Sequence, residues 1–304
     1  MNPAYHIPVL LSEALESLQV RADGTYVDCT FGGGGHSRAI LERLGPKGRL
    51  IAFDQDADAR RNLPADTRVT FVPHNFRHIG RFLKLEGVIA VDGILADLGV
   101  SSHQFDAAER GFSTRQDAAL DMRMDQRQQR TAATILATYT ESQLHKLFEQ
   151  YGEVTNARTL ARKIVAVRTQ VPLQTVDGFR QALREIVKGN PHKYFAQVFQ
   201  ALRIEVNDEL GALQELLIQA PALLKPGGRI AIISFHSLED RRVKHFFRSG
   251  HFDTPVTDPF RVNEPAHELL VITRKPVLPT EEECRTNPRA RSAKLRVAEK
   301  TMMV

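Results

Sequence analysis

Four consecutive glycines at positions 32–35 constrain the fold of this chain more than any other segment. They follow an apolar stretch that ends in Asp28, and they precede a helical pattern over 37–44. Glycine lets the backbone approach a ligand closely, and the first turn of a helix has free N–H groups. The order of strand, glycine turn and helix therefore predicts a nucleotide-cofactor cradle in an α/β domain. The alternative is a flexible loop beside an Asp that only forms a turn.

The spacing of the glycines narrows the choice of cofactor. The dinucleotide fingerprint G-x-G-x-x-G would need glycine at position 37 or 38, where the chain has Ser37 and Arg38, and no P-loop sequence occurs. Asp54 ends the next apolar stretch, and a carboxylate there can accept hydrogen bonds from both hydroxyls of a ribose. A ribose site without a pyrophosphate loop indicates S-adenosylmethionine, which has a ribose and no phosphate.

Apolar stretches alternate with helical patterns along most of the chain, which predicts an α/β fold with a doubly wound parallel sheet. The predicted strands are 25–28, 49–54, 69–72, 92–98, 229–235 and 268–273, with a tight turn at 224–228 and a basic tail over 284–300. From about residue 111 to residue 202 the pattern is helical. We therefore predict one α/β domain, residues 1–110 and 203–304, interrupted by an inserted helical domain over 111–202.

Positive charge is concentrated in two segments of a chain whose net charge is +5. Residues 156–203 contain nine Lys or Arg and two acidic residues, and residues 284–300 contain six Lys or Arg and one Glu. Two such clusters are typical of proteins that bind a polyanion such as nucleic acid. The alternative is a pair of solvated helix faces.

Several classes of protein are excluded. Cys29 and Cys284, the two cysteines, form neither a disulfide framework nor a metal site, and no apolar run approaches the roughly 20 residues that cross a bilayer. We expect a cytoplasmic protein that does not associate with membranes. His74 and His78 lack a third ligand, so no metal is expected. The segment 234–237 is not the G-x-S-x-G turn of acyl hydrolases, and neither cysteine has the context needed for pyrimidine C5 methylation.

Asp97 is the candidate catalytic residue. It lies near the end of the predicted strand 92–98, and the ligands of a doubly wound sheet bind at the carboxyl ends of its strands. An exocyclic amine has its lone pair delocalised into the ring, so a hydrogen-bond acceptor is needed to draw electron density onto nitrogen. Direct methyl transfer then depends on alignment. Asp97 is placed where the methyl group and such an amine would meet.

Seven blocks of sequence, spread from near the first residue to near the last, resemble the MraW family of methyltransferases, also called RsmH. The blocks are 6–11, 28–37, 92–102, 106–113, 120–125, 232–240 and 287–292. The resemblance implies a Rossmann-like class I S-adenosylmethionine-dependent methyltransferase domain with a helical insertion. It also implies an enzyme that methylates N4 of a cytidine in the decoding centre of 16S rRNA, in the small ribosomal subunit.

The resemblance also implies roles for individual residues. The implied cofactor contacts are Gly34, Gly35, His36, Asp54, Phe76, Asp97 and Gln104. Amino-methyltransferases in general carry Asp/Asn/Ser-Pro-Pro-aromatic, whereas residues 97–100 of this chain are Asp-Leu-Gly-Val. The aromatic residue that would stack on the base is therefore not identified by the sequence.

The two basic segments are expected to bind rRNA phosphates while the target base is swung out into the cleft. The candidates for these contacts are Arg158, Arg162, Lys163, Arg289 and Arg291. Alternative functions are methylation of an amine in DNA or a small molecule, a non-catalytic rRNA-binding assembly factor and, from the fold alone, a nicotinamide oxidoreductase. The sequence does not decide whether the protein forms a homodimer or whether the insertion closes over the cofactor.

Overall fold

The computed structural model describes residues 8–252 and 267–302, apart from the side chain of Ser102. The chain divides into two compact units: unit 1 consists of Met1–Gly99 and Leu210–Val304, and unit 2 of Val100–Glu209. Within the described residues, no helix combines the length and apolar composition that a membrane span requires.

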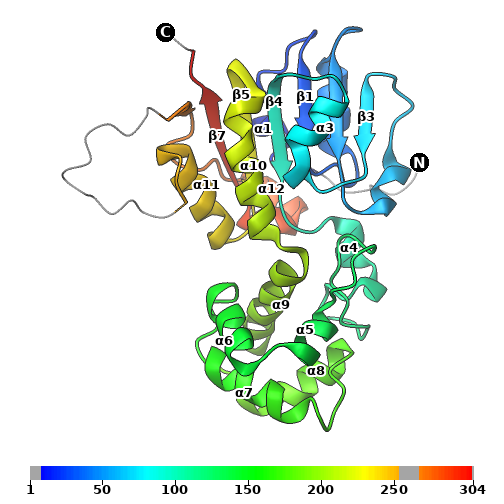
Figure 1. Cartoon of the computed structure of the whole chain (residues 1–304), viewed down its shortest axis with the longest axis vertical. Coiled ribbons are helices and arrows are strands. Elements are labelled where there is room, and N and C mark those ends of the chain that lie inside the picture. Colours follow the sequence, from blue (N-terminus) through cyan, green and yellow to red (C-terminus); the bar gives the residue numbers. More distant parts are fainter. Residues whose placement is uncertain (1–7, 253–266, 303–304) are drawn as a thin grey trace, which may run out of the picture. The chain divides into compact units, whose positions relative to one another are not determined.

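Unit 1 is built on a seven-stranded sheet with the order β3-β2-β1-β4-β5-β7-β6 (Figure 1). The strands are β1 (Thr25–Asp28), β2 (Arg49–Phe53), β3 (Val69–Val72), β4 (Val91–Asp97), β5 (Leu224–Ser234), β6 (Leu269–Val271) and β7 (Lys294–Lys300). The first five strands pair in parallel, and β7 runs antiparallel to both β5 and β6. The predicted parallel α/β sheet is confirmed.

Helices cover both faces of this sheet because the strands are apolar on both sides. One face packs against α1 (Leu11–Leu18) and α2 (Gly35–Arg43), and the other against α3 (Ile79–Leu85), α10 (Glu209–Leu223) and α11 (Ser237–Ser249). Along β4, Leu95 belongs to the first core and its neighbours Ile94 and Ala96 to the second. Figure 1 shows α3, α10 and α11 in front of the strands and α1 behind them. The short helix α12 (Glu281–Thr286) lies between β6 and β7 in the chain.

The predicted tight turn at 224–228 is wrong, because these residues belong to β5. Leu224 pairs with Val91 and Arg229 pairs with Gly93, so extra residues of β5 bulge out between two paired positions. Gly227 has a φ of 76°, a backbone conformation that a bulge can require and that glycine adopts without strain. The glycines therefore interrupt the pairing without ending the strand.

The second half of the predicted basic tail forms strand β7. Arg296 Nε donates to Asp240 Oδ1 at 2.6 Å, and Lys294 Nζ lies 3.4 Å from Asp240 Oδ2. Lys300 pairs with Glu268 at 3.6 Å. These three cations are therefore partnered within unit 1.

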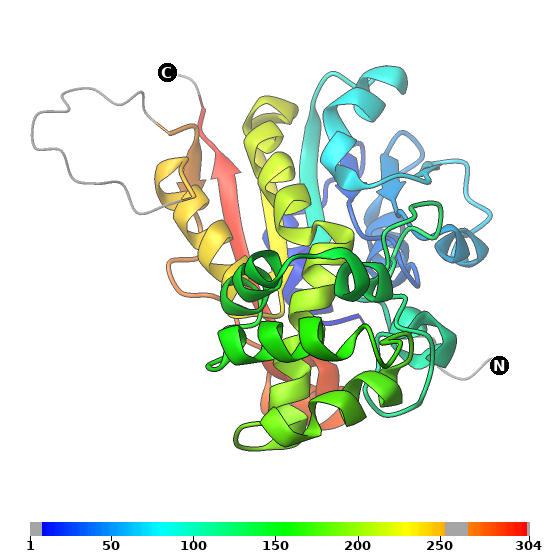
Figure 2. The same ribbon diagram turned by 60° about the horizontal axis from the view of Figure 1, so that its bottom comes forward.

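Unit 2 is helical, with one isolated bridge between Ala119 and Thr175 among its described residues. Its helices are α4 (Ser102–Asp106), α5 (Ala132–Thr138), α6 (Glu141–Gln150), α7 (Ala157–Val167), α8 (Val176–Leu183) and α9 (Pro191–Asn207). The helices α5 and α6 both contact α9, and the three lie side by side in two views (Figures 1 and 2). Threonines at positions 131 and 140 begin α5 and α6 with capping boxes, which satisfy the free N–H groups of the first turn.

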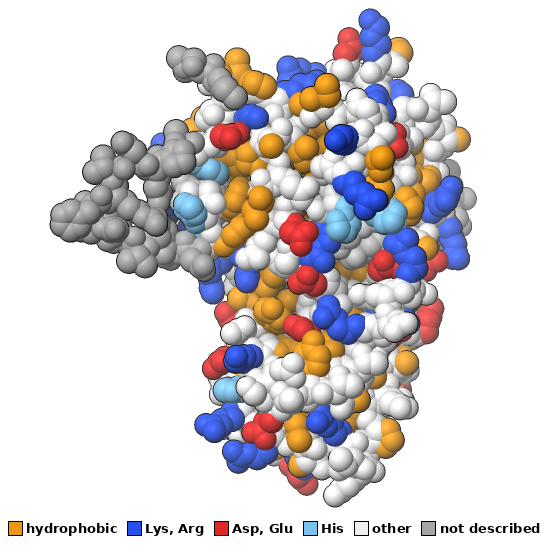
Figure 3. Space-filling model, viewed as in Figure 1, with side chains coloured by type: hydrophobic (Ala, Val, Ile, Leu, Met, Phe, Trp, Pro, Cys, Tyr) orange, Lys and Arg blue, Asp and Glu red, His pale blue; other side chains and the backbone are white. Residues whose placement is uncertain are grey.

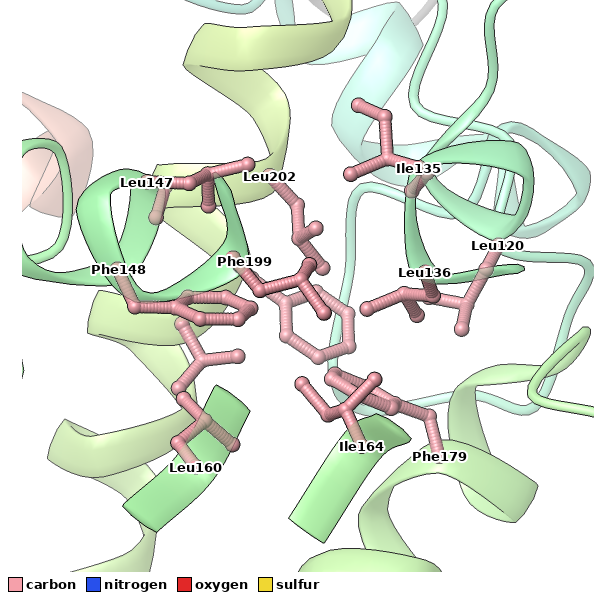
Figure 4. Packing of buried hydrophobic residues seen from close by; sticks show 14 of the residues in the cluster. Leu120, Ile135, Leu136, Leu147, Phe148, Leu160, Ile164, Phe179, Phe199 and Leu202 are labelled. Atoms are coloured by element: carbon pink, nitrogen blue, oxygen red, sulfur yellow. The ribbon is translucent and has the colours of Figure 1, made fainter. Parts of the chain in front are cut away.

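A separate hydrophobic core holds unit 2 together (Figure 4). Phe199 of α9 lies among Phe148 of α6, Ile164 of α7 and Phe179 of α8. Because this core is built from residues of unit 2 alone, the unit has the apolar interior that a domain of about 100 residues requires.

Asn207 ties the loop over 120–125, one of the family-like blocks, to the last turn of α9. Its Oδ1 accepts from the N–H of Met124 at 2.7 Å, and its Nδ2 donates to the carbonyl of Met122 at 2.8 Å. Arg110 Nη2 donates to the carbonyls of Arg123 and Met124 from the other side. This block therefore has a structural role in unit 2, where buried backbone groups need partners.

We expect Asn207→Ala to destabilise unit 2 by roughly 2–4 kcal/mol, because it leaves a buried N–H and a buried carbonyl without their partner. Urea unfolding followed by circular dichroism measures the loss, and hydrogen exchange of the peptide 118–128 should accelerate. The control is Gln200→Ala on the same helix, α9. This change removes one hydrogen bond, from Gln200 Nε2 to the carbonyl of Tyr151. A stability loss no larger than that of the control would contradict the proposed role.

Candidate functional site

The glycine loop connects the end of β1 to the start of α2, and its backbone packs closely against neighbouring side chains. Gly34 has a φ of 74°, and a Cβ atom built on it would lie 2.9 Å from the ring of Phe31. A Cβ atom on Gly35 would clash with the ring of Pro8. Any side chain at either position would therefore displace the loop or its neighbours, which explains why both positions are glycine.

Asp54 connects this loop to the end of β2. The N–H of Gly32 donates to Asp54 Oδ2 at 2.7 Å, and the N–H of Asp56 donates to Oδ1 at 2.8 Å. Burial raises the pKa of the Asp54 carboxyl to about 7, and these two hydrogen bonds only partly oppose the shift. Each carboxylate oxygen has a second lone pair, so Asp54 can still accept hydrogen bonds from a ribose.

Asp97, the last residue of β4, and His36, in the first turn of α2, face each other. His36 Nε2 lies 3.1 Å from the carbonyl of Val9, and since a carbonyl only accepts, this nitrogen carries a proton. His36 Nδ1 lies 3.8 Å from Asp97 Oδ2. The N–H of Asp97 donates to Thr30 Oγ1 at 2.7 Å, which fixes the end of the strand against the glycine loop.

Three carboxylates meet at this edge of the sheet: Asp28, Asp97 and Glu239. Asp28 is buried and accepts from Ser37 Oγ at 2.7 Å, and Glu239 is 2% exposed and accepts from the N–H of Phe235. Burial, followed by the negative charges of Asp28 and Glu239, raises the pKa of Asp97 well above its usual value. Asp97 Oδ1 is buried without a hydrogen-bond partner among the described residues.

These features fit S-adenosylmethionine. Its ammonium and sulfonium groups are cations, and a buried carboxylate oxygen without a donor is stabilised by such a group. Asp54, which follows the next strand, is the carboxylate placed for the ribose. The structure brings His36, which follows Gly34 and Gly35, within 3.8 Å of Asp97 at this edge of the sheet; the contacts of these residues with the cofactor stay a prediction.

Two further predicted cofactor residues belong to other elements. Phe76 begins a 3-10 helix (Phe76–His78) before α3 and packs against the core on that face of the sheet. Gln104 belongs to unit 2, where its Oε1 accepts from the N–H of Ser101 in the capping box of α4. Their contacts with the cofactor stay predictions.

The predicted rRNA-binding residues belong to two short helices. Arg158, Arg162 and Lys163 lie on α7, where Lys163 Nζ is 3.0 Å from Glu185 Oε2 and Arg162 Nε is 3.9 Å from Glu141 Oε1. Arg289 and Arg291 lie on the 3-10 helix Pro288–Ser292 of unit 1. On the face shown in Figure 3, Lys and Arg side chains alternate with Asp and Glu side chains over the helices of unit 2.

Sequence reasoning missed Glu239 as a member of the site. Its signal is its position three residues after His236 in the family-like block 232–240, which places both in the first turn of α11. His236 Nε2 lies 3.2 Å from Glu239 Oε1, and both side chains are more than nine-tenths buried. The negative charge of Glu239 also contributes to the raised pKa of Asp97, which places the start of α11 close to Asp97.

Comparisons with known proteins agree with the sequence blocks. The model of the MraW methylase family matches residues 3–301. A protein named ribosomal RNA small subunit methyltransferase H from Parabacteroides distasonis is 51% identical over 301 residues, covering 98% of this chain and 98% of that protein. The protein of the same name from Porphyromonas gingivalis is 54% identical over 301 residues and 97% of each chain. The solved structure of an rRNA methylase from Streptococcus thermophilus is similar over 98% of this chain and 100% of its own, with a TM-score of 0.43 and 10% identity.

We expect Asp97→Asn to stabilise the cofactor-free protein at pH 8 and much less at pH 5. A carboxyl whose pKa is raised by folding favours the folded state when protonated, and this stability is lost as the pH rises through the raised pKa. Removing the charge should therefore restore about 1 kcal/mol or more at pH 8, a rise of about 2–4 °C in Tm. Differential scanning calorimetry at the two pH values measures it.

The matched control is Asp66→Asn in the same unit. The Arg68 guanidinium lowers the pKa of Asp66 to about 2, so this change should leave the Tm equal or lower at pH 8. A Tm of Asp97→Asn at or below that of the wild type at pH 8 would show that ionised Asp97 does not destabilise the folded state.

Proposed function

Since this chain belongs to the MraW methylase family, we propose that it methylates N4 of a cytidine in the decoding centre of 16S rRNA, within the small ribosomal subunit. Membership of the family confirms the predicted Rossmann-like methyltransferase domain and its cofactor, S-adenosylmethionine. The observation that carries the proposal is the Oδ1 atom of Asp97, a buried acceptor without a donor among the described residues at the carboxyl edge of the sheet. A cytosine amino group is a donor of the kind that this atom lacks.

Asp97 acts on the amine in two ways. It accepts a hydrogen bond from the N4 amino group, which draws electron density onto nitrogen and holds the lone pair in line with the incoming methyl group. S-adenosylmethionine, when bound, supplies that methyl group on a positively charged sulfur. As the C–N bond forms and the C–S bond breaks, N4 becomes positively charged, and the Asp97 carboxylate accepts the proton that N4 then releases.

The neighbours of Asp97 adjust its basicity. Burial and the charges of Asp28 and Glu239 raise its pKa, which makes its carboxylate a stronger proton acceptor than a solvated one. His36 Nδ1 lies 3.8 Å from Asp97 Oδ2, beyond hydrogen-bonding distance, and forms one wall beside the carboxyl. We assign Gly34 and Gly35 to the methionine end of the cofactor, Asp54 to the ribose, Phe76 to the adenine and Gln104 to a further polar contact.

The proposal is tested by methyl transfer from labelled S-adenosylmethionine to small ribosomal subunits from a strain that lacks this activity. Nucleoside mass spectrometry should find N4-methylcytidine at a single site of the decoding centre. Label at another position or on another atom would overturn the assignment of the target. Label only in DNA would favour the alternative nucleic-acid substrate, and cofactor binding without any transfer would favour a non-catalytic assembly factor.

In the same assay we expect Asp97→Asn to lower kcat by about 10²–10⁴-fold, the range for loss of a positioned proton acceptor. For the wild type, kcat/KM should rise with pH as Asp97 ionises, because only the carboxylate accepts the proton, and should level off above its raised pKa. Single-turnover rates between pH 5.5 and 9 measure this dependence. A flat profile, or near-normal turnover by Asp97→Asn, would remove Asp97 from the chemistry.

Charge reversal on α7 tests the rRNA contact. We expect Arg162→Glu with Lys163→Glu to weaken binding to small subunits and to lower the slope of log K against log salt by about one for each phosphate that is no longer bound. Arg81→Glu with Lys84→Glu is the control, because these exposed residues of α3 lie outside both basic segments and the net charge changes equally. Equal effects of the two double variants would mean that α7 only carries solvated charge.

A further inference from the structure

An amine acceptor needs a second contact besides Asp97. A base that has been taken out of its stack is held in an active site by an aromatic or apolar face against its ring. In this chain the residues after Asp97 are Leu98, Gly99 and Val100, which provide no aromatic ring. The surface that holds the base must therefore come from another element.

The register of β4 and β5 brings Phe235 beside this segment. Asp97 pairs with Ile233, and the N–H of Leu98 donates to the carbonyl of Ile233 at 2.9 Å. Beyond the ends of the two strands the chain segments stay close, since a Cβ atom built on Gly99 would lie 3.6 Å from Phe235 Cδ2. Phe235 is thus the first residue beyond β5, next to the tripeptide that follows β4.

Asp97 and Phe235 also leave the sheet on the same side. Successive side chains of a strand point to opposite faces. Leu95, two residues before Asp97, and Ile233, two residues before Phe235, both belong to the core on the α1 and α2 face. Phe235 itself packs against that core and remains partly exposed.

Two features keep the ring of Phe235 in place and uncovered. Its N–H donates to Glu239 Oε2 at 2.9 Å, so the residue is fixed by the first turn of α11 after the strand has ended. Gly99 has a φ of 91° and no side chain, whereas a Cβ atom there would touch the ring. Phe31, an aromatic residue of the glycine loop, is 3% exposed and packs edge-on against Phe71, so its ring is not available to a base.

We propose that Phe235 stacks on the ring of the target cytosine and so holds the amino group beside Asp97. This inference rests on the proposed function, because it takes a cytosine as the base. It assigns to the residue after β5 the part that the aromatic residue after Pro-Pro has in other amino-methyltransferases. It also gives Glu239 a purpose, because its carboxylate positions the backbone of Phe235 through one hydrogen bond.

The first test compares Phe235→Leu with Phe235→Tyr on small subunits. Stacking on a base contributes about 1–3 kcal/mol, so Phe235→Leu should lower kcat/KM by about 5- to 150-fold, while Phe235→Tyr should retain most of the activity. Affinity for S-adenosylmethionine, measured by calorimetry, should change less than twofold in both. Phe252→Leu is the control: it removes a partly exposed ring that stacks on Phe246 at the far end of α11.

The second test observes the stacking directly. The chain has no tryptophan, so Phe235→Trp introduces a single fluorophore at the site. Cytidine 5′-monophosphate added to this variant in the presence of S-adenosylhomocysteine should quench its emission, and the same addition to Phe252→Trp should not. Quenching together with the loss of kcat/KM in Phe235→Leu supports the inference.

The outcomes separate this inference from the function on which it rests. Wild-type methylation of the subunit with equal activity of Phe235→Leu and no quenching of Phe235→Trp overturns the role of Phe235 alone. No methylation of the subunit by the wild type overturns the proposed function. In that case, quenching by the nucleotide would still support a base-stacking site at Phe235, and its absence would overturn that as well.

Discussion

The carboxylates at the carboxyl edge of the sheet are the constraint on which the rest of the site depends. Asp28, Asp97 and Glu239 come from the ends of β1 and β4 and the start of α11, and the charges of the other two raise the cost of ionising Asp97. A fold keeps such a group only where a ligand offsets the cost, since a buried acceptor without a donor is otherwise destabilising. Hydrogen bonds from Ser37 and the N–H of Thr30 hold Asp28, and one from the N–H of Phe235 holds Glu239. The site is thus built in advance for a cation and a donor.

Much of this arrangement could be predicted from the sequence because local patterns specify it. The apolar stretch before Asp28 and the glycines after it define a strand and a turn, and the bounds of β1 and β3 agree with those predicted. Strand ends in a parallel sheet lie at one edge, so the sequence alone assigns Asp28, Asp54 and Asp97 to a common cleft. The positions of Gly34 and Gly35 could also be predicted to lie in a tight loop, because the backbone there packs too closely for a side chain.

The features that could not be predicted depend on partners far away in the sequence. In the first half of β7 charged residues alternate with apolar ones, and Arg296 pairs with Asp240, which lies 56 residues earlier. A charge count alone cannot distinguish such a strand from a solvated basic tail. The β5 bulge likewise depends on pairing with Val91 and Gly93, and Glu239 enters the site because α11 begins directly after β5. Register, more than composition, decided these positions.

Charge and shape therefore contribute differently to recognition of the substrate. With Lys294, Arg296 and Lys300 paired inside unit 1, fewer cations of the second basic segment face a phosphate backbone than its composition suggests. On α7, Lys163 also has an acidic neighbour in Glu185, which the phosphate of the proposed rRNA contact would have to displace. Phosphate contacts position a nucleic acid but carry no sequence information. In the proposed reaction, selection of one cytidine would then come from the contacts that read the base itself, which we assign to an acceptor, Asp97, and a flat ring, Phe235.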